Sequence, residues 1–217
     1  PMEPFHFHRG LALSLSKGFT LVELMVVLAI IVTITTLALT SQSSFNKPLI
    51  LANTAYDIAL TLRSAESFGL GSRALPSTVN AGYGLHFQKG AAGSFILFAD
   101  TSGGVSCIGM APDCKPGDHV YTPGADTLVQ TYTLGNGITV SDFCAFSGSN
   151  ESCAYAHDGG LSSLDIVFAR PNPDAFINAN GSSYTGACLT ITSPQGGFRY
   201  IAVASSGAIT ANASSCP

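Results

Sequence analysis

The 217-residue chain is long enough for one domain of ordinary size plus an extra segment. Charged residues make up only 10% of it, the net charge is −4, and no run of Lys or Arg follows residue 18. This composition argues against a nucleic-acid partner, because nucleic-acid-binding proteins normally carry a basic face. Hydrophobic residues reach 46% and are concentrated between residues 21 and 39, so the sequence predicts a membrane anchor joined to a globular domain.

The N-terminal region places its basic and small residues before the apolar run. Arg9, Lys17 and Gly18 precede residues 19–39, whereas a secretory signal has its small-residue cleavage site after the apolar core. Cleavage after Gly18 would therefore leave the apolar segment on the mature chain. Residues 19–39 contain no Gly or Pro and would extend about 31 Å as a helix, which matches a bilayer. The preceding positive charges predict a cytoplasmic N-terminus and a C-terminal domain outside the membrane.

Glu23 is an exception within the apolar run. A carboxylate in a spanning helix costs about 2.5–3.5 kcal/mol on insertion scales, and such residues usually have a partner. One interpretation is that Glu23 lies near the headgroups and reaches water. The other is that cleavage after Gly18 creates an α-amino group on Phe19, four residues before Glu23, which pairs with the carboxylate in the same chain or in a neighbouring copy.

The segment 17–24 reads Lys-Gly-Phe-Thr-Leu-Val-Glu-Leu. It resembles the processing and methylation motif of type IV prepilins and of the pseudopilins of type II secretion. The resemblance implies cleavage between Gly18 and Phe19, N-methylation of Phe19, and an assembly role for the residues that follow, namely Thr20, Leu21, Val22 and Glu23. The implied partners are a prepilin peptidase/N-methyltransferase, other pilins or pseudopilins in a helical filament, and an inner-membrane assembly platform. The implied location is the inner membrane, with the C-terminal domain in the periplasm or outside, and then a pilus or pseudopilus.

A second apolar pattern follows Pro48. Apolar residues recur at helical spacing on one stripe, formed by Leu51, Ala55, Ile58, Leu62 and Ala65. We expect one long helix from residue 19 to about residue 69, bent or interrupted near Pro48 and ended by Gly69 and Gly71. Its second half should pack on the globular domain.

From residue 83 onward the pattern has a period of two residues. The predicted strands are residues 83–88, 94–99, 128–134, 138–142, 164–169, 187–192, 199–204 and 208–211. Because no strand–helix–strand alternation occurs, the expected fold class is α+β, with a long N-terminal helix packed on an antiparallel β-sheet or β-sandwich, as in pilins. The expected organisation is a leader at 1–18, a transmembrane and filament-core helix at 19–40, an amphipathic continuation at 41–72, and a β-rich extracytoplasmic domain at 73–217.

All six cysteines lie between residues 107 and 216, and none forms a CxxC pair. An even number in loop-like sequence after a membrane segment indicates disulfides in an oxidising compartment. Six cysteines allow 15 connectivities, and we expect neighbours to pair as Cys107–Cys114, Cys144–Cys153 and Cys188–Cys216.

Two short segments refine the resemblance. Residues 60–67 are similar to a helical stretch of the pseudopilin H / FimT-FimU minor pilin group, and residues 198–209 resemble the strand, Ser-Gly turn and strand near that group's C-terminus. They favour a minor pilin or pseudopilin over a major pilin. The alternative is a major type IV pilin, or a pilus-borne adhesin or DNA-uptake module. The C-terminal residues 213–217 lack the basic side chains that DNA binding needs.

The sequence offers no catalytic motif. Its five histidines are scattered, and it contains no nucleophile elbow, P-loop or H-E-x-x-H motif. Asp113, Asp118 and Asp126 flank a Gly/Pro-rich loop, but their spacing matches no calcium-loop template. We therefore expect no enzyme activity, no cofactor and no metal site.

Overall fold

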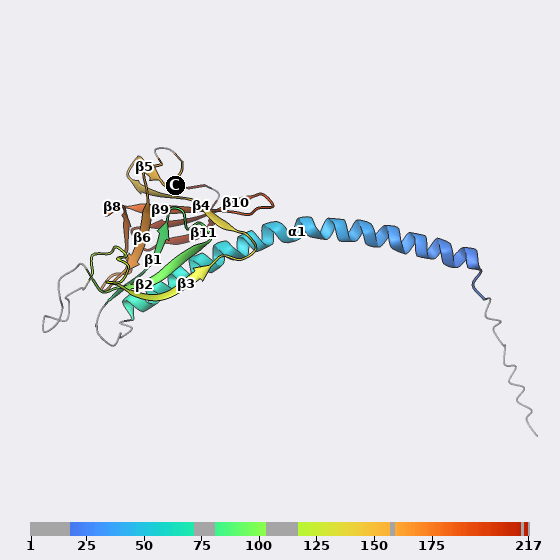
Figure 1. Cartoon of the computed structure of the whole chain (residues 1–217), viewed down its shortest axis with the longest axis horizontal. Helices are drawn as coiled ribbons and strands as arrows, with labels where there is room; N and C mark the ends of the chain where they lie inside the picture. Colours follow the sequence, from blue (N-terminus) through green and yellow to red (C-terminus); the bar gives the residue numbers. More distant parts are fainter. Residues whose placement is uncertain (1–17, 72–80, 103–116, 157–158, 214, 217) are drawn as a thin grey trace, which may run out of the picture. The chain divides into compact units, whose positions relative to one another are not determined.

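The computed structural model describes residues 18–71, 81–102, 117–156, 159–213 and 215–216, without the side chains of 40–47 and 212. The chain divides into two compact units, Pro1–Ser44 and Phe45–Pro217. The N-terminal unit contains the first part of helix α1 (Leu21–Leu70), and the second unit contains the rest of α1 and all the strands (Figure 1).

Helix α1 begins two residues later than predicted and continues through Pro48. Of the two predicted possibilities near Pro48, a bend or an interruption, the interruption is therefore wrong. A proline removes one donor from the helix, but the turns on either side keep their own hydrogen bonds. From Leu51 onward the helix is also held by packing, because Leu51, Ala55, Ile58 and Leu62 are buried in the core of the second unit.

The strands of the second unit form two antiparallel sheets, so the predicted α+β fold class is confirmed. The six-stranded sheet has the order β3-β2-β1-β6-β7-β8, and the five-stranded sheet has the order β11-β10-β9-β4-β5. The first comprises β1 (Gly82–Gln88), β2 (Ser94–Asp100), β3 (Thr127–Thr133), β6 (Ser163–Phe168), β7 (Ala175–Ala179) and β8 (Ser182–Tyr184). The second comprises β4 (Thr139–Ser147), β5 (Asn150–Cys153), β9 (Gly186–Thr192), β10 (Phe198–Ala204) and β11 (Ile209–Ala213).

Three short strands, β5, β7 and β8, were not predicted. Each is too short for a sustained β-branched and aromatic run; β5 pairs with the longer strand β4, β7 pairs with β6, and β8 pairs with β7. Strand β4 also extends to Ser147, five residues past its predicted end. Neighbouring strands therefore induced structure that local propensity alone does not indicate.

One hydrophobic core joins the helix to both sheets. It includes helix residues such as Ile58 and Leu62, Leu85 from β1, and Leu189 and Ile201 from β9 and β10. Because side chains alternate along a strand, each strand presents one set to this core and the other set to the outer face of its sheet. The outer faces carry the polar clusters described below.

Candidate processing and assembly site

The N-terminus of α1 begins at a capping residue. The backbone N–H of Glu23 donates to the Thr20 hydroxyl at 3.2 Å, and the N–H of Leu24 donates to the Thr20 carbonyl at 3.1 Å. Thr20 is thus the N-cap and Glu23 the third helical residue, which is the Thr-x-x-Glu pattern of a capping box. The helix starts at Leu21 because Thr20 satisfies a backbone donor that would otherwise have no partner.

Gly18 and Phe19 lie outside the helix, and both are exposed. A Cβ added to Gly18 would meet no atom within 4 Å, and the Phe19 side chain is 73% exposed. The peptide bond between them is therefore not protected by helical hydrogen bonding. Lys17, the preceding residue of the predicted site, lies outside the described residues.

The apolar segment that follows is long enough to cross a membrane. Leu21–Leu39 comprises 19 residues with a mean hydropathy of 2.5, and none of it is buried in the structure. The Thr33 and Thr36 hydroxyls donate to the Ile30 and Val32 carbonyls at 2.8 and 2.7 Å, and the Thr35 hydroxyl donates to the Ile31 carbonyl. These bonds satisfy the three hydroxyls within the helix, so the threonines are compatible with an apolar environment.

Glu23 is the one acidic residue of Leu21–Leu39. It lies in the first turn of α1, where the helix dipole favours negative charge. Among the described residues its carboxylate makes no ion pair, and the ion pairs found are Arg63–Glu66 and His86–Asp165. The Glu23 carboxylate is therefore available to form an ion pair with a cationic group from another part of the assembly.

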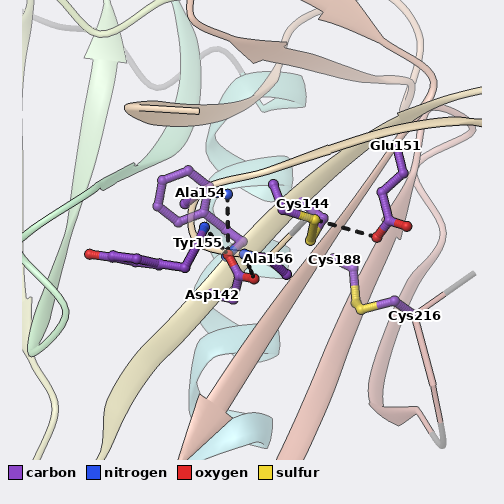
Figure 2. Close-up of a disulfide and its surroundings, with 10 residues drawn as sticks. Asp142, Cys144, Glu151, Ala154, Tyr155, Ala156, Cys188 and Cys216 are labelled. Carbon is purple, nitrogen blue, oxygen red and sulfur yellow. Dashed lines mark hydrogen bonds between the residues drawn. A yellow bond between two sulfur atoms is a disulfide. The ribbon is translucent and has the colours of Figure 1, made fainter. Parts of the chain in front are cut away.

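Two disulfides lie on the outer face of the five-stranded sheet. Cys144 of β4 bonds to Cys153 of β5, with a Cα–Cα distance of 4.0 Å, and Cys188 of β9 bonds to Cys216, at 5.7 Å (Figure 2). In the strand register Cys144 faces Cys153 on one side and Cys188 on the other. The two bonds therefore fasten an edge strand and the C-terminal segment to adjacent strands. The expected third pair, Cys107–Cys114, lies outside the described residues.

Asp142 holds the end of the β4–β5 hairpin, a role that the sequence analysis missed. Figure 2 shows its carboxylate beside the backbone of residues 154–156, and the N–H groups of Ala154, Tyr155 and Ala156 donate to it at 2.9–3.1 Å. Its oxygens also lie near the sulfurs of Cys144 and Cys153. Those sulfurs are bonded to each other and the carboxylate is occupied by N–H donors, so the group is structural rather than metal-binding.

The predicted acidic loop is used in the same way. Asp126 accepts the backbone N–H groups of Thr101, Ser102 and Thr122 at 2.7–2.9 Å. Asp118 accepts the N–H of Val120 at 3.1 Å. Backbone donors therefore occupy the Asp126 carboxylate, whereas Asp118 is exposed and accepts one N–H, and Asp113 lies outside the described residues.

A family profile described as the prokaryotic N-terminal methylation motif matches residues 13–39. No curated protein and no solved structure matches the chain significantly. The match contains the Gly18–Phe19 bond, Glu23 and the apolar helix, and it supports a type IV pilin-like or pseudopilin structural subunit. The motif implies processing by a prepilin peptidase and assembly with other pilins. The two sheets lie outside the matched residues.

Proposed function

We propose that the chain is a minor pilin or pseudopilin that is cleaved between Gly18 and Phe19, N-methylated on Phe19, and assembled into a filament through its apolar helix. The observation that carries the proposal is the methylation motif at the start of an exposed apolar helix. The leader is residues 1–18, the anchor and filament core is 19–40, and the amphipathic continuation at 41–72 joins it to the extracytoplasmic domain at 73–217.

The processing step requires access to one peptide bond. Because Gly18 and Phe19 precede the helix and are exposed, a peptidase on the cytoplasmic side of the membrane can reach the bond without unwinding the helix. Lys17 contributes the positive charge that keeps this end in the cytoplasm. The new Phe19 amine then lies four residues before Glu23, just outside the helix.

The assembly step transfers the helix from lipid to protein. In the membrane, lipid covers the side chains of Leu21–Leu39, which no protein group covers in the single chain. In the filament, helices of neighbouring subunits replace the lipid, and the Glu23 carboxylate pairs with a Phe19 amine. This pairing neutralises two charges in an apolar layer and sets the axial position of each subunit. Thr20, Leu21 and Val22 lie between the paired groups.

The first experiment tests processing. The full chain is expressed with an active or an inactive prepilin peptidase, and the N-terminal peptide is identified by mass spectrometry. We expect N-methylated Phe19 as the first residue only with the active enzyme. Gly18→Ala should abolish cleavage without changing the fold, since the added methyl group meets no other atom. A mature chain that begins at any other residue refutes the assignment.

The second experiment tests assembly. Glu23→Gln keeps the shape of the side chain and removes its charge, so we expect normal cleavage and at least a roughly tenfold loss of chain in the sheared filament fraction. Asp57→Asn, a change at an exposed acid of the same helix, is the matched control and should assemble normally. Equal filament yield from both variants contradicts the pairing.

The choice of a minor component is supported by residues 60–67 and 198–209, which resemble the pseudopilin H / FimT-FimU group. The partners would be a peptidase/N-methyltransferase, an inner-membrane assembly platform and other pilins. Its stoichiometry in purified filaments, measured by quantitative mass spectrometry, tests whether it is a minor component. A chain that forms filaments alone and makes up most of their mass is a major pilin instead.

A further inference from the structure

The outer face of the six-stranded sheet carries a buried polar network. This face holds four of the six buried polar residues among those described, namely His86, Asp100, Asp165 and Asn178. They are covered by residues 117–126, the segment that leads into β3 and that we call the strap. Buried polar groups are costly unless they are hydrogen-bonded, so the bonds between this face and the strap decide whether the strap stays closed.

The first contact is between Asp100 and the start of the strap. The His119 backbone N–H donates to Asp100 Oδ2 at 2.7 Å, and the other oxygen, Oδ1, has no hydrogen-bond partner among the described residues. The Gly117 backbone lies directly against the carboxylate, since a Cβ at Gly117 would come within about 2 Å of it. Asp100 is 0% exposed.

The charges around Asp100 are unfavourable for an ionised carboxylate. Burial raises the pKa of Asp100 to about 7, and the negative charges of Asp126 and Asp118 act in the same direction, whereas the backbone donors of the strap lower it. An ionised Asp100 would thus be buried beside two acids and would leave one oxygen without a donor.

The second contact is between Asp165 and the middle of the strap. Asp165 Oδ1 lies 2.7 Å from His86 Nδ1 and accepts the Tyr121 backbone N–H at 3.3 Å. The Tyr121 ring covers His86 and Phe98, at centroid distances of 4.9 and 5.0 Å. Burial also raises the pKa of Asp165, although the hydrogen bond and charge of His86 lower it.

We propose that the strap is a pH-sensitive latch, which is closed on the sheet while Asp100 is protonated and loosens when Asp100 ionises. In the open form the carboxylate is hydrated and separated from Asp118 and Asp126, so opening relieves both the desolvation and the repulsion. Opening also removes Tyr121 from Phe98, which is fully buried beneath it. The latch thus controls the exposure of an aromatic surface on the domain.

The sign and size of the effect follow from the two protonation equilibria. The folded-state pKa of Asp100, about 7, lies above the ordinary value of 3.8, so the closed strap is favoured below 3.8 and loses stability as the pH rises toward 7. If Asp100 regains its ordinary pKa in the open form, the opening constant increases by about one hundredfold between pH 5 and pH 8 and levels off above pH 7.

Hydrogen exchange of the full chain in detergent micelles tests the latch. Protection factors, corrected for the intrinsic pH dependence of exchange, are measured by mass spectrometry on peptides covering 117–126 and on β4–β5 peptides as an internal control. We expect protection of the strap to fall by up to about one hundredfold from pH 5 to pH 8, and protection of the β4–β5 peptides to change little. Asp100→Asn should make strap protection nearly independent of pH.

Asp126→Asn is the matched control. Asp126 accepts three backbone N–H groups, fastens the far end of the strap, and adds its negative charge to the repulsion on Asp100. Its replacement should therefore lower protection at every pH and reduce the pH slope only in part, because burial is the largest cause of the raised Asp100 pKa. Constant strap protection from pH 5 to pH 8 in the native chain overturns the proposal, and this measurement needs no variant. A full pH slope in folded Asp100→Asn also overturns it.

Discussion

Replacing Leu62 with alanine tests the packing of the second half of α1 on the two sheets. Leu62 is 0% exposed and belongs to the core that includes Leu85 and Leu189. Truncation removes apolar surface and leaves a cavity between rigid strands, so we expect a loss of about 2–5 kcal/mol in the free energy of unfolding. With a urea m-value of about 2 kcal/mol/M, this loss lowers the unfolding midpoint by roughly 1–2.5 M.

The control is Leu60→Ala, two residues away on the same helix. Leu60 is 66% exposed, so its truncation should change the free energy of unfolding by no more than about 0.5 kcal/mol. Both variants replace leucine with alanine inside the same helix, so the change in helix propensity is equal and the two differ only in burial. The assay is urea unfolding of the full chain in detergent micelles, followed by far-UV circular dichroism. Equal midpoints for the two variants would refute the packing of this helical face.

Three further changes test other contacts. Replacing both Cys188 and Cys216 with serine removes a disulfide that spans 28 positions and should lower the free energy of unfolding by about 3–4 kcal/mol. An unchanged urea midpoint would contradict this role. Gly69→Ala should lower the melting temperature by several degrees, because its Cβ would lie 2.1 Å from the Phe168 carbonyl oxygen, and an unchanged melting temperature contradicts this close packing. Asp142→Asn removes the charge from three hydrogen bonds and should increase hydrogen exchange of residues 154–156 selectively, whereas a uniform increase across the domain would argue against a local role.

The N-terminal features could be predicted because they depend on neighbours along the chain. An apolar run and an acid at a fixed offset from Phe19 act through hydropathy and charge within a few residues. The core-facing stripe of α1 was predicted from helical spacing for the same reason, and Leu51, Ile58 and Leu62 are buried as expected. The start of the helix moved to Leu21 because the Thr20 cap outweighs the apolar pattern that begins at Phe19.

The polar clusters of the two sheets could not be predicted from the sequence. Asp100 and the strap residue His119 are separated by 19 positions, and His86 and Asp165 by 79, so no local pattern links them. Asp142 reads as a surface acid beside a cysteine until β5 brings residues 154–156 against it. A charge becomes a buried anchor only when another strand or segment covers it.

The sequence by itself determined an anchored chain with a processing motif, a long helix and a β-rich domain, because each of these is encoded in short-range periodicity or composition. Only the tertiary structure decided how the strands divide into two sheets, which cysteines align across β5, β4 and β9, and which acids lie beneath the strap. These outcomes depend on contacts between distant segments, where burial changes the energy of a charge and strand register decides which side chains meet.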